Sequence, residues 1–218
     1  MLAVVVADGD PAPEDAELVR RADLLVAADG GARWIQSLGV VPHLVVGDLD
    51  SLDQATIAGL SGAGARVERY PSDKDASDTE LAVEAALKAG AEQVVVLGAL
   101  GGSRVDHELA NVLLLADPAL SGTGMRLQRD GTLARAVNGP GTLELEVGVG
   151  ATVTLLPIGG GAVGVTTRGL RYPLEDEPLA VGRSRGLSNV VTEENASVSL
   201  RAGTLLVIEI DNAKEGES

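Results

Sequence analysis

The sequence predicts an α/β fold: a mostly parallel sheet with helices on both faces, followed by a small all-β sandwich. Over about the first 135 of the 218 residues, short β-branched runs alternate with helical periodicities, which is typical of strand-helix-strand units. A Gly/Pro cluster occupies residues 138–141, and after it short strand patterns replace the helix-length ones. With 45% hydrophobic residues, the chain has enough material for the cores of two such domains.

The first domain is predicted to span residues 1–137 and to contain six strands. The strands are predicted at residues 2–7, 24–28, 44–47, 66–70, 94–98 and 126–128. Between them, residues 79–89 have apolar positions at helical spacing and end at Gly90. Residues 105–116 form a second clear helix, whose apolar stripe consists of Val105, Leu109, Val112, Leu113 and Ala116. This order of elements predicts a Rossmann-like sheet.

The second domain is predicted to be a β sandwich over residues 138–211. Its strands are expected at residues 143–147, 152–156, 164–167, 196–200 and 205–210, with a hairpin loop at residues 159–161. Residues 212–218 are polar, and we expect them to form a disordered tail.

Composition and charge exclude several classes of protein. The chain has 17 Lys and Arg against 32 Asp and Glu, a formal charge of −15, and lacks the basic cluster of a nucleic-acid-binding protein. No apolar run approaches the roughly 20 residues that a membrane span requires. The absence of cysteine excludes disulfides, so we expect a cytoplasmic protein. With only two histidines, any metal ion is expected to have oxygen ligands.

Aspartates follow several predicted strands of the first domain: Asp8, Asp10, Asp29, Asp48 and Asp50. Ligands of parallel α/β sheets bind at the carboxyl ends of the strands, so these side chains are expected to converge there. If the backbone stays extended, Asp48 and Asp50 project to one side, which suits a Mg²⁺ ion that also binds phosphate oxygens. The alternative for any single aspartate is that it ends a strand or begins a helix.

A second acidic segment, residues 72–80, precedes the first clear helix. Ser77 and Glu80 have the spacing of a capping box, and acids in a first helical turn are stabilising. Capping leaves Asp73 and Asp75 unexplained, and carboxylates this close repel one another unless a cation is present. A metal-bound phosphate at this helix start accounts for the whole segment.

A third segment, residues 98–107, leads from a predicted strand through glycines into a helix. Gly101 and Gly102 let main-chain amides approach a ligand closely, and Arg104 has donor geometry for phosphate. The alternative is a tight turn with Ser103 as the helix cap. A Walker A loop is excluded, because no lysine follows a glycine.

These segments, in this order, resemble motifs of the thiamine pyrophosphokinase family. The first domain carries Asp29-Gly30-Gly31-Ala32, Gly47-Asp48-Leu49-Asp50-Ser51, Lys74-Asp75-x-Ser77-Asp78-Thr79-Glu80 and Gly101-Gly102-x-Arg104-x-Asp106-His107. The second carries Gly169-Leu170-Arg171-Tyr172-Pro173-Leu174 and Gly186-Leu187-Ser188-Asn189, which resemble the thiamine-binding domain of bacterial members. Each motif alone is weak, whereas six in order over nearly the whole chain are specific.

The resemblance implies transfer of the diphosphoryl group of Mg-ATP to the hydroxyethyl group of thiamine, giving thiamine diphosphate and AMP. It also implies a homodimer, with thiamine between the catalytic domain of one subunit and the sandwich of its partner. By motif position, Mg²⁺ would be held by Asp48, Asp50 and Asp78 with Asp75 close by, and Asp106 would complete the catalytic acids. ATP and its phosphates would contact Asp29, Gly30, Ser77, Gly101, Gly102 and Arg104, and thiamine would contact Asp106, Ser188 and Asn189.

Four features depart from the family pattern. Ser77 stands where many members have Thr, which preserves the hydroxyl, and Arg33 stands where Asn is common. The segment Gly101-Gly102-Ser103-Arg104 has one residue more than the shorter Gly-Gly-Arg version, and the second domain lacks the Trp with which eukaryotic members stack on thiamine. Two alternative functions stay open: a diphosphokinase for another heterocyclic alcohol such as 6-hydroxymethylpterin, and a non-catalytic thiamine- or nucleotide-binding protein. The segment Gly186-Leu187-Ser188-Asn189 favours thiamine, and the intact set of acids argues against mere binding.

Overall fold

The chain forms two compact units in the computed structural model, which describes residues 1–212. Of the predicted tail at residues 212–218, only residue 212 is described, and residues 213–218 lie outside the described part of the chain. Unit 1 comprises residues 1–114 and 122–130, and unit 2 comprises residues 115–121 and those from 131 onward. The sequence placed the boundary at 137–138, later than the structure does. The reason is that strand β7 (Thr132–Asn138) pairs along its whole length with β13 (Ala202–Ile210) of unit 2.

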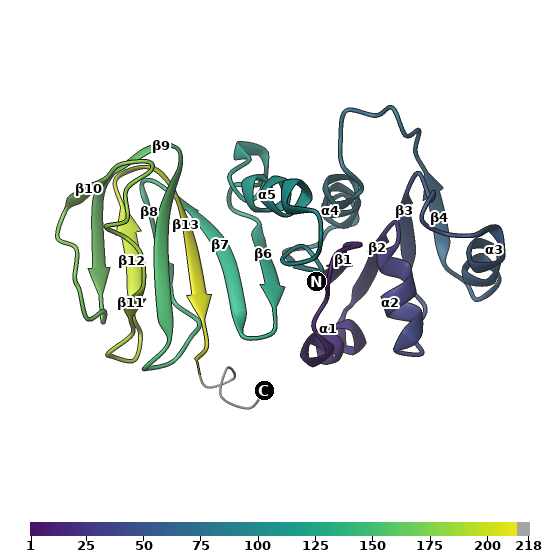
Figure 1. Cartoon of the computed structure of the whole chain (residues 1–218), viewed down its shortest axis with the longest axis horizontal. Helices are drawn as coiled ribbons and strands as arrows, with labels where there is room; N and C mark the ends of the chain where they lie inside the picture. The colour runs from purple at the N-terminus through teal and green to yellow at the C-terminus, as the bar shows by residue number, and fades with distance from the viewer. Residues whose placement is uncertain (213–218) are drawn as a thin grey trace. The chain divides into compact units, whose positions relative to one another are not determined.

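Unit 1 is built on a sheet of six parallel strands, as predicted. They are β1 (Leu2–Val6), β2 (Leu24–Ala28), β3 (Leu44–Gly47), β4 (Arg66–Arg69), β5 (Gln93–Leu97) and β6 (Gly124–Arg129). Their spatial order is β4-β3-β2-β1-β5-β6, and every neighbouring pair is parallel. The labelled strands β1, β2, β3 and β4 follow one another in this order in Figure 1. The chain builds outward from β1 to β4 and then returns to add β5 beside β1. Ligands of such sheets bind at this point of reversal.

Helices cover both faces of the unit 1 sheet. They are α1 (Ala16–Arg21), α2 (Gly31–Ser37), α3 (Gln54–Gly62), α4 (Asp78–Lys88) and α5 (Val105–Leu114), with a 3-10 turn at Pro13–Asp15. On one face, Val19 of α1, Ile35 of α2 and Leu60 of α3 pack in one core. Strand residues such as Val4 and Leu25 belong to the same core. The intervening strand residues face the other side, where α4 packs against β1, β2, β3 and β5. Within residues 1–212, no helix has the length and apolar character needed to cross a membrane.

Helix α4 begins as the sequence predicted. Ser77 is its N-cap residue, and Ser77 Oγ accepts a hydrogen bond from the backbone N–H of Glu80 at 3.1 Å. The helix buries Ala82, Val83 and Ala86. The capping prediction is therefore confirmed, and it fixes the direction in which the acidic first turn points.

Helix α5 forms where it was predicted, but its apolar stripe does not pack into the core. Val105, Leu109 and Leu113 are 63%, 57% and 57% exposed. The buried residue of this helix is Asn111, whose Nδ2 donates a hydrogen bond to Ala99 O at 3.2 Å. Because this bond anchors the polar face of α5 to the loop after β5, the apolar side chains stay outside the core.

Unit 2 consists of antiparallel strands around a second core. Besides β7 and β13, they are β8 (Gly141–Glu144), β9 (Thr152–Arg168), β10 (Glu177–Leu179), β11 (Asn189–Val190) and β12 (Ser197–Leu200), and a 3-10 turn lies at Pro118–Leu120. β13 pairs with β7 and β9, β12 pairs with β8 and β9, and both β10 and β11 pair with β9. The core contains branched apolar residues such as Leu155, Val198 and Leu205.

The hairpin loop predicted at residues 159–161 is wrong, because these residues lie inside β9. β13 pairs with β9 on both sides of the glycine run, through Thr204 with Ile158 and Ala202 with Val163. The extra residues are taken up where the register shifts, with Gly159 at φ +71°, which is the behaviour of a β-bulge. The two strands predicted here are therefore one.

Unit 2 also buries a charged residue, Glu209 on β13, which is 0% exposed. Its carboxylate accepts hydrogen bonds from the Arg135 guanidinium and from the backbone N–H groups of Glu146 at 2.6 Å and Val147 at 3.3 Å. A buried carboxylate is tolerated when its charge is paired and its oxygens are bonded, as they are here.

Candidate active site

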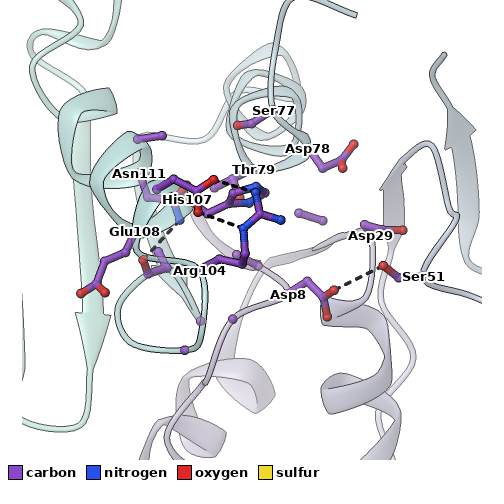
Figure 2. A pocket seen from close by; sticks show the side chains of 18 of the residues that line it. Asp8, Asp29, Ser51, Ser77, Asp78, Thr79, Arg104, His107, Glu108 and Asn111 are labelled. Atoms are coloured by element: carbon purple, nitrogen blue, oxygen red, sulfur yellow. Dashed lines mark hydrogen bonds and ion pairs between the residues drawn. The ribbon is translucent and has the colours of Figure 1, made fainter. Parts of the chain in front are cut away.

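A pocket of about 860 Å³ lies in unit 1 at the carboxyl ends of β1, β2, β3 and β5, beside the first turns of α4 and α5. This is the position expected from the reversal of strand order. Figure 2 shows the labelled side chains in two groups, with Asp8, Asp29, Ser51 and Asp78 toward one side and Arg104, His107 and Asn111 toward the other.

Three carboxylates from different elements converge in this pocket. One oxygen each of Asp29, Asp48 and Asp78 lies within 4.8 Å of the other two. Burial raises the pKa of Asp29, and the charges of Asp78, Asp8 and Asp48 raise it further. The backbone N–H of Asp50 donates to Asp48 Oδ1 at 3.2 Å and lowers the pKa of Asp48. Three carboxylates this close repel one another, so the cluster favours a cation.

Lys74 places a positive charge beside the cluster. Its Nζ lies 2.8 Å from Asp78 Oδ1. This distance is that of an ion pair, but the atoms are not aligned for a hydrogen bond. Asp78 Oδ1 is therefore a buried oxygen without a hydrogen-bond donor, and the same holds for Asp29 Oδ1. Burial alone would lower the pKa of Lys74, but the attraction of Asp78, Asp48 and Asp29 outweighs it and raises that pKa.

The extended backbone assumed for residues 48–50 is wrong. β3 ends at Gly47, and the buried Leu49 between the two aspartates has a φ of +64°, which is left-handed and breaks the alternation of a strand. Asp50 and Asp75 line the pocket, but in the described part of the chain the three-carboxylate cluster does not include them. Their role as metal ligands stays a prediction.

Glycines allow the loops of the pocket to lie close together. A Cβ on Gly30, the N-cap of α2, would lie 2.1 Å from Asp8 Oδ1. Gly30 therefore makes room for an aspartate from the neighbouring strand and is not itself part of the pocket lining. Gly101 and Gly102 do line the pocket and have φ values of +76° and +97°, a region that favours glycine.

Arg104 and Asp106 line the pocket as a bidentate pair. Arg104 Nε donates to Asp106 Oδ1 at 2.9 Å, and Arg104 Nη2 donates to Asp106 Oδ2 at 2.6 Å. These hydrogen bonds hold the pKa of Asp106 well below its usual range. Ser77, His107 and Asn111 line the same pocket, so all three predicted segments of the first domain contribute to it.

Two arginines join the loops around the pocket. Arg129, at the end of β6, donates to Asp10 O at 3.0 Å and to Asp10 Oδ2 at 2.6 Å. Arg33, on α2, donates to Asp8 Oδ1 at 3.1 Å and to the backbone carbonyl of Ser51. Asp10, which the sequence grouped with the converging acids, is thus a partner of Arg129. Arg33, where the family pattern has Asn, links the loops after β1 and β3.

Ser188 and Asn189, predicted to contact thiamine, lie in unit 2. The Asn189 side chain is buried, and its amide accepts from Tyr172 N at 3.0 Å and Val190 N at 2.9 Å and donates to Tyr172 O at 2.8 Å. It therefore fixes the backbone of Tyr172, whose side chain is 56% exposed. Ser188 is exposed and has a φ of +53°.

Asp29 is among the acids that the sequence predicts to converge, but its motif position assigned it to ATP and not to the metal, and Lys74 received no role. Asp29 follows β2 and Asp48 follows β3, and the two meet because these strands are neighbours. Strand patterns alone do not show which strands are adjacent. For Lys74 a signal was available, since it lies four residues before Asp78 in the same motif.

Comparisons with known proteins match both parts of the chain. The family description "Thiamin pyrophosphokinase, catalytic domain" matches residues 16–127, and "Thiamin pyrophosphokinase, vitamin B1 binding domain" matches residues 142–205. The thiamine pyrophosphokinase of Bacillus subtilis (strain 168) is 25% identical over 186 residues, which is 85% of this chain and 86% of the relative.

Solved structures agree with these matches. A thiamin pyrophosphokinase family protein from Enterococcus faecalis is 26% identical with a TM-score of 0.81, and the match covers 97% of this chain and 99% of that one. The thiamine pyrophosphokinase structure from Bacillus subtilis has a TM-score of 0.85 at 22% identity over 97% of this chain and 100% of that one, which supports the fold. With the catalytic-domain description alone matching more than half of its residues, the chain belongs to the thiamin pyrophosphokinase family.

Proposed function

We propose that this chain transfers the diphosphoryl group of ATP to the hydroxyethyl oxygen of thiamine, giving thiamine diphosphate and AMP. Both parts of the family match in the expected order, and curated relatives carry the name thiamine pyrophosphokinase. The observation that carries the proposal is the convergence of Asp29, Asp48 and Asp78 in the pocket of unit 1. Three adjacent carboxylates disfavour a bare anion but suit a metal-bound polyphosphate.

The donor set at this cluster fits Mg²⁺. Mg²⁺ takes oxygen ligands, usually carboxylates together with phosphate oxygens and water, and two of the three carboxylates have a buried oxygen without a hydrogen-bond donor. We propose that Asp29, Asp48 and Asp78 hold the ion, with Asp50 and Asp75 as further acids of the pocket. When bound, Mg²⁺ supplies positive charge that offsets the charge of the polyphosphate.

The other pocket residues would bind and orient the phosphates. Gly101 and Gly102 present backbone N–H groups without obstruction by a side chain. Arg104 adds a guanidinium that matches phosphate oxygens. Ser77 begins α4, whose first amides favour negative charge. Such positioning and charge stabilisation supply most of the rate enhancement in phosphoryl transfer.

In this reaction the thiamine hydroxyl oxygen forms a bond to the β-phosphorus, and AMP leaves with the oxygen that bridged the α- and β-phosphorus atoms. A loose transition state needs little help in removing the hydroxyl proton. Asp106 is a poor proton acceptor, because Arg104 holds its pKa well below the usual range. We propose that the role of Asp106 is to orient Arg104.

The thiamine side of the site is assigned to unit 2. We propose that this unit is a sandwich in which β9 belongs to both sheets, since β9 pairs with β13 over its first half and with β12 near its end. Tyr172 is the only aromatic residue after residue 138 in the sequence. With its backbone fixed by Asn189 and its side chain exposed, Tyr172 is the proposed stacking partner of thiamine, and the neighbouring Ser188 is a proposed polar contact.

The homodimer, with thiamine between two subunits, is also part of the proposal. It is supported by the exposed apolar side chains of Val105, Leu109 and Leu113 on α5, which suit a protein contact. The test is to co-express Asp50→Asn and Tyr172→Ala chains, after an assay of each variant alone has established its loss of activity. A site shared between subunits gives one intact site in each mixed dimer and restores activity, whereas sites confined to one chain leave the mixture inactive.

Product analysis tests the function itself. Purified protein with Mg²⁺, ATP and thiamine is expected to give AMP and thiamine diphosphate in equal amounts. ADP with thiamine monophosphate would reject diphosphoryl transfer, and faster turnover of 6-hydroxymethylpterin would favour the alternative substrate. Binding of both ligands without product would identify a non-catalytic protein. The cytoplasmic location stays a prediction from composition.

A further inference from the structure

We propose that Lys74 is a further catalytic residue, which neutralises the three-carboxylate cluster in the free protein and moves to a phosphate oxygen when the metal-nucleotide complex binds. The inference rests on the proposed function, because it assumes that Asp29, Asp48 and Asp78 bind a divalent cation. Its consequence is that the free protein binds the cation weakly and that cation and nucleotide bind together.

The position of Lys74 is the first argument. Its Nζ lies 2.8 Å from Asp78 Oδ1, and the Lys74 side chain is only 14% exposed while that of Asp78 is 26% exposed. Elsewhere in unit 1, Lys88 and Glu84 have the same spacing and a 2.7 Å contact, but their side chains are 73% and 44% exposed. The Lys74 ammonium is therefore held inside the pocket, whereas Lys88 belongs to an ordinary surface pair.

The charge balance of the pocket is the second argument. Its lining includes eight acidic residues, Asp8, Asp29, Asp48, Asp50, Asp75, Asp78, Asp106 and Glu108, and two fully charged basic residues, Lys74 and Arg104. Arg104 is bound to Asp106 through two hydrogen bonds. Lys74 is thus the pocket cation that faces the carboxylate cluster. Burial lowers the pKa of Lys74, but the attraction of Asp78, Asp48 and Asp29 raises it by more, so the side chain keeps its charge.

A divalent cation at the cluster changes this balance. The cation and the Lys74 ammonium would share the Asp78 carboxylate and repel each other. Lysine suits a change of partner, because its ammonium is a compact charge with three donors on a flexible four-carbon stem. A polyphosphate bound in the same pocket offers oxygens that can accept these donors. The ammonium therefore has a place to go only when nucleotide is present.

The test measures Mn²⁺ binding to the full-length protein in the absence of turnover, with and without α,β-methylene-ATP. Lys74→Met is expected to bind Mn²⁺ at least about tenfold more tightly than the unmodified protein when no nucleotide is present. This factor follows from screened repulsion between an ammonium and a dication a few ångströms apart. The nucleotide analogue should tighten Mn²⁺ binding strongly in the unmodified protein and much less in the variant, since the two ligands are coupled through Lys74.

Two further variants make the result decisive. Lys74→Arg keeps the charge and should retain the weak Mn²⁺ binding of the unmodified protein, and Lys88→Met should change neither Mn²⁺ affinity nor its coupling to nucleotide. Circular dichroism establishes that each variant is folded, and Lys74→Gln replaces Lys74→Met if the latter is not. Equal or weaker Mn²⁺ binding by the charge-removing variant overturns the proposal, as does tight binding by Lys74→Arg or a complete lack of Mn²⁺ binding. The product assay on the unmodified protein decides the proposed function separately.

Discussion

Replacing Asp29 by Asn is expected to stabilise the metal-free protein while removing its stabilisation by Mg²⁺. Asp29 is 6% exposed, and its carboxylate lies within 4.8 Å of those of Asp48 and Asp78. Two like charges at that separation repel by about 1 kcal/mol at the dielectric constant of water and by about 3.5 kcal/mol at an effective value of 20. Lys74 offsets roughly one of the two repulsions, which leaves a net gain of about 1 to 3.5 kcal/mol for the variant.

The sign of the effect follows from the pKa of Asp29. Burial, and then the neighbouring carboxylates, raise this pKa in the folded protein, so the folded state keeps the proton to a higher pH than the unfolded chain does. The free energy of unfolding therefore falls as the pH rises from the ordinary aspartate value through the raised one. At a pH above the raised pKa, the charged Asp29 destabilises the folded protein. The neutral amide of the Asp29→Asn variant carries no charge and can donate hydrogen bonds to the neighbouring carboxylates, so it lacks this effect.

The assay is thermal unfolding at neutral pH, in EDTA and in Mg²⁺. For a chain of this length 1 kcal/mol corresponds to roughly 2–4 °C, so Asp29→Asn should raise the Tm by at least about 2 °C in EDTA. Asp73→Asn removes one charge from an exposed residue near the same pocket and serves as the control for net charge. A variant that is less stable than the unmodified protein in EDTA, or that gains as much from Mg²⁺, would refute the reasoning.

Three other outcomes are expected. Asp50→Asn should lower kcat by about 100-fold or more with an unchanged fold, and near-normal turnover in the steady-state assay would remove its role at the metal. Ser188→Ala should raise the KM for thiamine far more than the KM for ATP, and equal effects on both would contradict a contact with thiamine. Glu209→Ala should lower the free energy of unfolding by about 2–5 kcal/mol, because it removes the carboxylate that accepts from the Arg135 guanidinium and from the backbone N–H groups of Glu146 and Val147; a loss below about 1 kcal/mol in urea denaturation would argue against that network.

The parts of the fold that depend on local pattern were predictable from the sequence. The six strands of unit 1 and the Ser77 cap of α4 are examples, since periodicity and capping are encoded within a few residues. The exposed face of α5 was not predictable, because an apolar stripe signals burial without naming the surface that covers it. The glycine run inside β9 was mistaken for a turn, since a bulge and a hairpin loop both call for glycine.

The candidate site was predictable in its composition but not in its arrangement. The motifs pointed to the acids of the loops, and all three predicted segments of the first domain do line one pocket. The membership of Asp29 in the cluster depends on the order of β2 and β3, which is a property of the assembled sheet. The turn at Leu49, which separates Asp48 from Asp50, depends on a buried side chain that no two-residue spacing reveals.

The pairing of Arg104 with Asp106 bears on how products leave. Both side chains are about two-thirds exposed, at 64% and 65%, so water already screens the pair and little stability is lost when it separates. In the proposed reaction, the highly charged tripolyphosphate would attract the Arg104 guanidinium away from Asp106, and the pair would form again when AMP, which carries less charge, is left. Asp106 would then compete with phosphate for Arg104 and so favour the release of AMP once transfer is complete.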